Sequence, residues 1–171
     1  MPDWPTHLIV PLLALFIVSK KEDIRYILML LPLAIVPDLD TFAAQHRALL
    51  HNIFIPLMLL LFGFLASKGK RTIFMISSVY LASHVVLDMF GGGVALLYPF
   101  YDKMIYISAS LVMDRASDLI WTLDFGSRPY DSGWKTGYGF ISDSPGTGAI
   151  VFLLLAGVGM AYRNWIKEEH K

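Results

Sequence analysis

The chain of 171 residues contains no cysteine. This absence excludes disulfide bonds, thiolate metal sites and a thiol nucleophile, so any metal ion would be held by nitrogen and oxygen atoms. The sequence also lacks a G-x-S-x-G elbow, a P-loop and an H-E-x-x-H motif. Serine hydrolysis therefore has no supporting motif, and an enzyme with this sequence would use a metal-activated water as its nucleophile.

Charged residues are also scarce, at 16% of the chain against about 25% in a soluble globular domain. Hydrophobic residues make up 56%. The formal net charge is zero and there is no basic stripe, so nucleic acid is not an expected partner. We therefore predict a single integral membrane domain over residues 1–171, with the lipid bilayer as its partner.

Five apolar segments stand out, at residues 4–19, 24–36, 52–67, 73–90 and 147–162. Most are shorter than the ~20 residues that span a bilayer, so each alone could be a core helix. Several are apolar on all faces, as in IFIPLMLLLFGFLA, and their polar groups collect at one end, which favours membrane helices. The sequence predicts an all-α polytopic bundle of about five transmembrane helices. Its MPDWPTH start has no basic residue, so we do not expect a cleaved signal peptide.

Residues 91–146 are predicted to form a long extracytoplasmic insert between the fourth and fifth helices. The insert is rich in aromatic residues, glycine and aspartate, and its GGG and YPF tripeptides predict turns. Residues 105–113 and 119–125 have the pattern of short strands or of interfacial amphipathic segments.

Lysine and arginine residues predict the orientation. If the N-terminus lies outside and five segments alternate, nine of the fourteen basic residues fall on the inner side. Short basic loops stay in the cytoplasm, so we predict a multi-pass plasma membrane protein with its N-terminus outside and its C-terminus inside. The nine are Lys20, Lys21, Arg25, Lys68, Lys70, Arg71, Arg163, Lys167 and Lys171.

Acids and histidines gather at the outer ends of these apolar segments. His7 opens the first, and the motifs PDLD (37–40), HRALLH (46–51) and SHVVLD (83–88) follow. Ionisable groups within apolar segments are costly unless something holds them, and a divalent cation is the simplest explanation. The candidate metal ligands are His7, Asp38, Asp40, His46, His51, His84 and Asp88.

Two of these motifs pair an acid with a second polar group. His84 and Asp88 are four residues apart, so on a helix they share a face and either ligate one ion or form a hydrogen-bonded pair. Asp38 and Asp40 follow Pro37, which predicts that PDLD begins a loop. There the two carboxylates could chelate a cation, or Asp40 could cap a helix.

The HRALLH motif adds an arginine. His46 and His51 are five residues apart and point in different directions on one helix, so a helix begins between them or they serve different ions. Arg47 shares a helical face with His51 and is a candidate clamp for a phosphate, or a snorkelling interfacial arginine. With Arg47, we take Asp88 and Asp40 as the candidate catalytic residues.

Together these residues suit hydrolytic metal chemistry. Mixed histidine and aspartate ligation is typical of Zn²⁺, with Mn²⁺ as an alternative, and the number of donors allows one or two ions. Two ions could activate a water and clamp both oxygens of a displacement at phosphorus.

The order of these motifs, followed by Gly93 and Pro99, resembles the YdjM-type membrane-bound metal-dependent hydrolases of bacteria and archaea over about residues 1–100. Members carry P-D-x-D, H-R-x-x-x-H and S/T-H-x-x-x-D. The resemblance implies an integral membrane hydrolase whose metal site is built from the seven candidate ligands. Members often have Thr-His-Ser around the second histidine of the H-R motif, and this chain has Leu50, His51 and Asn52 there.

The leading hypothesis is a hydrolase of a phosphoester in a lipid, a lipid-linked phosphate or another amphiphile, with its site near the outer face. A non-enzymatic transport or sensor protein with an ion-binding His/Asp cluster is the alternative, and it predicts polar groups spread across the bilayer. A soluble or peripheral metallohydrolase with apolar helices is the third, and it predicts extraction from membranes without detergent.

Overall fold

The computed structural model describes residues 4–43, 47–113, 119–131 and 157–158. The named elements in these residues are four α-helices, two 3₁₀ segments and one two-stranded antiparallel sheet. In chain order they are α1 (Trp4–Val18), η1 (Lys21–Asp23), α2 (Ile24–Leu30), η2 (Leu31–Ala43), α3 (Phe54–Leu65), α4 (Lys68–Phe90), β1 (Met104–Met113) and β2 (Leu119–Arg128).

The predicted all-α bundle of about five transmembrane helices is wrong. Within the described residues only α4, with 23 residues, is long and apolar enough to cross a membrane. The apolar helices α1 and α3 have 15 and 12 residues. At 1.5 Å per residue they reach about 22 and 18 Å, short of the roughly 30 Å hydrocarbon layer. A uniformly apolar composition therefore did not distinguish a membrane-spanning helix from a shorter one.

The second predicted helix divides into two elements. The α-helix α2 ends at Leu30, and the chain continues as the 3₁₀ segment η2 to Ala43. Pro32 and Pro37 lie in this stretch, and each removes a backbone N–H that an α-helix needs. The PDLD motif accordingly lies within η2, where a loop was expected.

Residues 104–128 add a β-hairpin, the second departure from an all-α fold. The strands pair in register, with Ile107 opposite Phe125 and Ser110 opposite Thr122. Alternate residues therefore lie on opposite faces of the hairpin. Trp121, Leu123 and Phe125 share one face and are 71%, 69% and 79% exposed. This alternation of apolar and polar residues explains why the segment forms strands.

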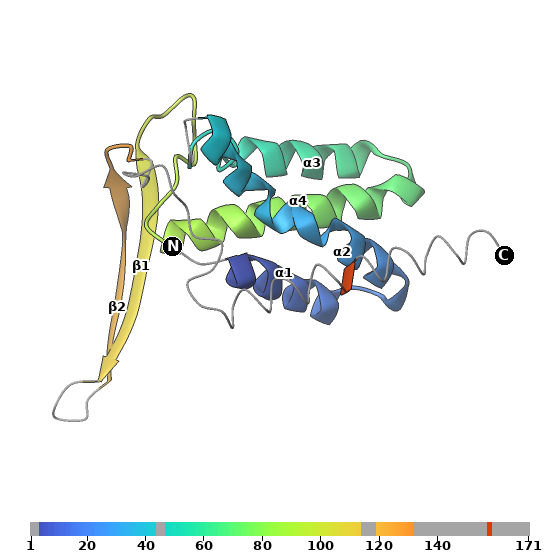
Figure 1. Ribbon diagram of the computed structural model, residues 1–171, viewed down its shortest axis with the longest axis horizontal. Helices are drawn as coiled ribbons and strands as arrows, with labels where there is room; N and C mark the ends of the chain where they lie inside the picture. The colour runs from blue at the N-terminus through green and yellow to red at the C-terminus, as the bar shows by residue number, and fades with distance from the viewer. Residues whose placement is uncertain (1–3, 44–46, 114–118, 132–156, 159–171) are drawn as a thin grey trace.

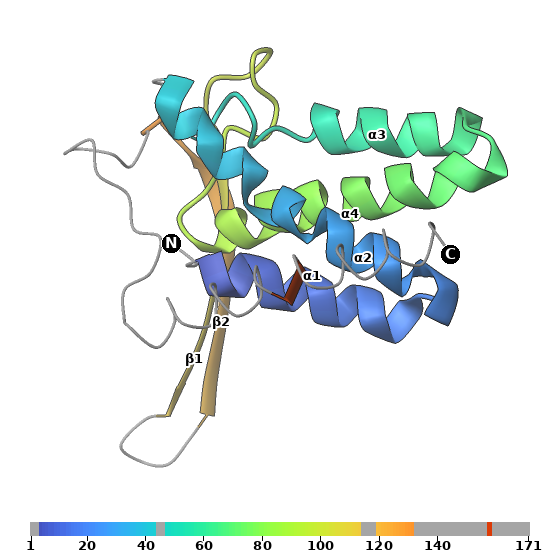
Figure 2. The same cartoon turned by 45° about the vertical axis from the view of Figure 1, so that its right-hand side comes forward.

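The helices run side by side, and the hairpin stands across one end of them (Figures 1 and 2). The start of α1, the end of η2, the start of α3 and the end of α4 all lie at this hairpin end. The turns from α1 to α2 and from α3 to α4 lie at the opposite end. Those turns and the helix starts that follow them carry Lys20, Lys21, Arg25, Lys68, Lys70 and Arg71.

A buried core joins α1, α2, η2 and α4. Its members are Leu8, Leu12, Leu15, Ile27, Leu31, Ala34, Ile76 and Tyr80. The Tyr80 hydroxyl donates to the Ile27 carbonyl oxygen at 2.8 Å, so the one polar atom of this ring is satisfied. Most of the fifth predicted helix lies outside the described residues, but Val158 packs against this core. The core fixes the ends of α1, η2 and α4 relative to one another.

Candidate metal centre

Five of the seven candidate ligands converge at the hairpin end. His7 comes from the first turns of α1, Asp38 from η2, His51 from the turns before α3, and His84 and Asp88 from one face of α4. The imidazoles of His7, His51 and His84 are at most 1% exposed. Segments far apart in the sequence therefore place imidazoles and carboxylates around one buried point.

Four of these residues form a group that could hold a metal ion. One atom from each of Asp38, His51, His84 and Asp88 lies within 4.8 Å of the others. The Nε2 atoms of the two histidines are 3.1 Å apart. His51 Nε2 is 3.7 Å from Asp38 Oδ1 and 3.1 Å from Asp88 Oδ2, and His84 Nε2 is 3.4 and 3.7 Å from the same two oxygens.

These separations suit tetrahedral coordination. Four nitrogen and oxygen ligands at the usual zinc distances lie about 3.4 Å from one another at the corners of a tetrahedron. Five of the six separations run from 3.1 to 3.7 Å, and the sixth, between the carboxylate oxygens of Asp38 and Asp88, is within 4.8 Å. The donor set, two imidazoles and two carboxylates, also suits Zn²⁺ or Mn²⁺.

Each imidazole is held by its other nitrogen. His84 Nδ1 donates to the carbonyl oxygen of Ala34 at 2.6 Å, because a carbonyl oxygen can only accept. His51 Nδ1 lies 2.8 Å from Asp40 Oδ2, which also accepts from the Leu50 backbone N–H at 3.3 Å. In both rings Nε2 therefore faces the common point, the arrangement expected of metal-ligating histidines.

The acids and His51 perturb one another strongly. Burial by itself lowers the pKa of His51, but hydrogen bonds with Asp38, Asp40 and Asp88 raise it to about 10. Burial alone raises the pKa of Asp38, but hydrogen bonds from His51 and His84 hold it well below its usual range. Without an ion, the cluster therefore keeps a proton on His51 and a charge on Asp38.

His7 and Asp88 carry buried polar atoms that the described residues leave unsatisfied. Their side-chain atoms do not meet full hydrogen-bond geometry with any described residue, although Asp88 forms ion pairs with His7 and, through Oδ2 at 3.1 Å, with His51 Nε2. His7 Nε2 lies 3.3 Å from Asp88 Oδ1, and the His7 ring stacks on His84 with the centroids 4.0 Å apart. Unsatisfied buried acceptors are costly, so this region fits a bound cation.

Arg47 lies beside this cluster on an unusual backbone. It has a φ of 66°, its side chain is 3% exposed, and its Nη2 donates to the Gly91 carbonyl oxygen at 3.4 Å. Burial lowers the pKa of Arg47, although the charge of Asp88 opposes that shift. Residues 47–53 form turns, so the predicted helical face shared by Arg47 and His51 is not present.

The remaining candidates divide. Asp40 is buried behind His51 and contacts its Nδ1, so it is not one of the four converging donors. His46 lies outside the described residues. The side-chain oxygen of Asn52 accepts from the Phe54 and Ile55 N–H groups at 3.0 and 3.2 Å. Asn52 precedes the N-cap residue Ile53 and satisfies two free N–H groups in the first turn of α3.

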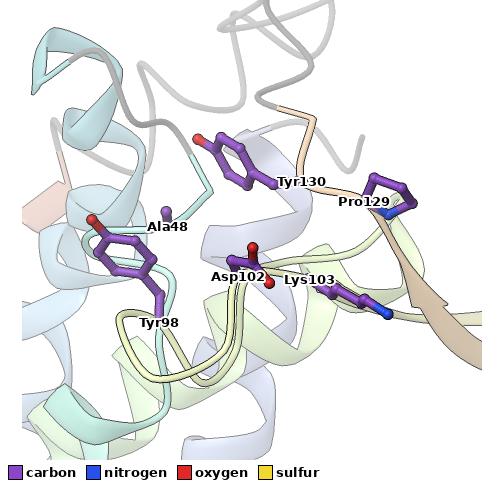
Figure 3. A pocket seen from close by; sticks show the side chains of 6 residues that line it. All are labelled: Ala48, Tyr98, Asp102, Lys103, Pro129 and Tyr130. Atoms are coloured by element: carbon purple, nitrogen blue, oxygen red, sulfur yellow. The ribbon is translucent and has the colours of Figure 1, made fainter.

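A cavity of about 370 Å³ is lined in part by Ala48, the residue that follows Arg47 (Figure 3). Its lining consists of Ala48, Tyr98, Asp102, Lys103, Pro129 and Tyr130. Burial raises the pKa of Tyr130, and the nearby charge of Asp40 adds to the rise. Tyr130 is therefore within electrostatic range of the carboxylate that holds His51. No sequence motif marks Tyr130, because only the fold of the chain after β2 brings it here.

The comparisons with known proteins identify one family. A family model described as YdjM inner membrane protein matches residues 1–167. No curated protein and no solved structure matches the chain. The matched region includes every residue of the metal centre and of the hairpin.

Proposed function

The chain belongs to the YdjM family of inner membrane proteins, and from this premise we propose that it is a metal-dependent hydrolase of a phosphoester in a lipid or lipid-linked substrate. The observation that carries the proposal is the four-donor group of Asp38, His51, His84 and Asp88. Two buried imidazoles with fixed Nδ1 atoms and two carboxylates at ligand spacing are costly to assemble without a cation.

Zn²⁺ is the proposed ion and Mn²⁺ the alternative. When bound, it would accept a ligand beyond the four protein donors, and so lower the pKa of a water molecule and polarise a phosphoryl oxygen. Asp38 and Asp88 would neutralise the ion, and Asp40 would keep the His51 ring in place through Nδ1. Arg47 would stabilise the charge that develops on the phosphoryl oxygens. Asp40 therefore acts as a positioning residue in this proposal, while Arg47 contacts the substrate.

A second ion is also part of the proposal. His7 Nε2 and Asp88 Oδ1 form an ion pair at 3.3 Å, and neither atom meets full hydrogen-bond geometry with a described residue. His7 and Asp88 would hold this second ion. His46 is a candidate for a further ligand, from the sequence alone.

The membrane location follows from the family, and we propose its details. Exposed apolar side chains on α1 and α3, including Ile17 and Leu65 at 84% and 75% exposure, suit a lipid surrounding. We propose that α4 crosses the membrane with its basic start, Lys68 to Arg71, in the cytoplasm. The metal centre near the other end of α4 would then lie at the outer face, where an amphiphilic phosphoester can reach it.

The test compares metal content and turnover in detergent-purified protein. The wild type should carry one to two Zn²⁺ or Mn²⁺ per chain by elemental analysis, and it should hydrolyse a phosphomonoester, a phosphodiester or a phospholipid in mixed micelles. His84→Ala should lose metal and turnover while remaining folded. His170→Ala, which removes a histidine of the C-terminal tail, is the matched control and should change neither. A correctly folded wild type that binds neither metal would refute the proposal.

A further inference from the structure

Two arginines from distant parts of the chain meet at Gly92. A methyl group built on Gly92 would lie 3.3 Å from Nη1 of Arg47 and 3.3 Å from Nη2 of Arg128. Arg47 comes from the turn before α3, and Arg128 is the last residue of β2. Gly92 has a φ of 124°, which side chains rarely adopt, so both its backbone and its missing side chain leave room for the two guanidinium groups.

Two guanidinium groups that approach the same point, one buried and one exposed, form a favourable place for an anion. Within the described ranges neither guanidinium forms an ion pair with a carboxylate, and the buried Nε of Arg47 has no hydrogen-bond partner. The acids whose charges act on Arg47 are Asp88, Asp38 and Asp131, and a cation bound among the histidines would neutralise the first two. A buried donor without a partner, such as this Nε, is costly, and paired guanidiniums are a usual site for phosphate oxygens.

The residues that directly follow the two arginines in the sequence line the cavity. Ala48 follows Arg47, Pro129 follows Arg128, and both residues line it. Figure 3 shows Tyr130 at the top and Tyr98 at the left, with Asp102 below Tyr130 and to the right of Tyr98. The cavity's volume of about 370 Å³ is enough for a small organic group, and its walls combine aromatic rings with charged side chains.

We propose that Arg47 and Arg128 together bind the phosphate group of the substrate at Gly92, while the group esterified to that phosphate occupies the cavity between Tyr98 and Tyr130. The hairpin thus contributes a phosphate-binding residue to the centre. This inference deepens the proposed function and rests on it for the identity of the anion as substrate. The phosphate could belong to a lipid headgroup or to a free phosphate compound, and both would use the same two guanidiniums.

Binding of two probes tests the pair without relying on turnover. Detergent-purified full-length protein, dialysed free of unbound metal, is titrated with inorganic phosphate and with short-chain phosphatidic acid by calorimetry. Arg128→Gln should weaken both by on the order of 10- to 100-fold, the usual worth of a charged hydrogen bond. Arg128→Lys keeps the charge but loses the planar set of donors, so its affinity for both probes should lie between those of the wild type and Arg128→Gln. The matched control, Arg71→Gln at the far end of α4, should bind like the wild type.

Metal content measured on the same samples separates the two proposals. Arg128→Gln should retain the wild-type metal content, because Arg128 is not among the donor residues. If it retains metal and binds both probes as tightly as the wild type, the arginine pair is refuted and the metal proposal stands. If the wild type contains no metal but its phosphate binding depends on Arg128, the metal proposal falls and the anion site stands. Tighter binding of phosphatidic acid than of phosphate would assign the site to a lipid headgroup.

Discussion

Replacement of Asp40 by asparagine tests whether Asp40 positions the ligand His51 or is itself a metal ligand. Asp40 Oδ2 lies 2.8 Å from His51 Nδ1 and accepts the Leu50 N–H at 3.3 Å, so the carboxylate contacts the ring on the side away from the four donors. An asparagine oxygen can accept from the same N–H groups, so the fold should survive. What is lost is the negative charge that makes His51 a stronger ligand.

The magnitude follows from this geometry. Loss of a carboxylate behind a ligating histidine typically weakens metal binding 10- to 100-fold, or about 1.4 to 2.7 kcal/mol. Asp40 also helps to raise the pKa of His51, so its loss weakens the competition from protons at the same time. That compensation acts only below the raised pKa. The cost of Asp40→Asn should therefore be smallest at pH 6 and grow as the pH rises.

A competition titration with a chromophoric chelator at pH 6, 7 and 8.5 measures the dissociation constant for Zn²⁺. Asp38→Asn removes a proposed ligand and should cost far more than Asp40→Asn, to the point of losing stoichiometric metal. Asp124→Asn, which changes an exposed carboxylate of the hairpin, is the matched control. If Asp40→Asn loses as much affinity as Asp38→Asn, Asp40 is itself a ligand and the assignment is wrong; if it loses none, the contact with His51 has no role in binding.

Two further outcomes are expected. The pKa of His51 is raised to about 10 in the absence of metal, and a ligating imidazole must be neutral. Zn²⁺ binding at pH 7 should therefore release about one proton from this residue, and the affinity for Zn²⁺ should fall about tenfold for each unit that the pH falls. Calorimetry in buffers of different ionisation enthalpy measures the release, and a binding enthalpy independent of the buffer would contradict it. Asn52→Ala removes the acceptor for the Phe54 and Ile55 N–H groups and should lower the free energy of unfolding by about 1 kcal/mol in a denaturant titration with metal content unchanged, whereas loss of the metal would show that Asn52 supports the centre as well as α3.

The sequence indicated which acids and histidines cluster, but not which of them face the common point and which lie behind a histidine. The four-residue spacing of His84 and Asp88 specifies one face of a helix, and an apolar chain collects its acids and histidines at few places, so the cluster was predictable as a group. The spacing could not separate Asp38, which faces the other donors, from Asp40, which faces away. That difference depends on the direction of two side chains in η2, and prolines took this segment out of the helical pattern.

Other parts of the site carry no local signal. The carbonyl of Ala34 fixes His84, and every residue has a carbonyl, so no residue type marks it. Arg128 and Arg47 both approach Gly92 only because the end of β2 returns to this glycine, an arrangement that depends on tertiary structure. The predicted number of membrane-crossing helices was wrong for a related reason. Apolar segments of 13 to 18 residues have the composition of a membrane span but not its length.

The absence of cysteine gives the donor cluster a second consequence. His51 and His84 are 33 residues apart in the chain, and no disulfide can join these segments. An ion held by both would act as a covalent staple does, closing that loop and restricting the unfolded chain by on the order of 4 kcal/mol in chain-entropy terms. A chelator would then do more than stop turnover: it would loosen the joint between the turn before α3 and the end of α4, and so make the whole protein easier to unfold.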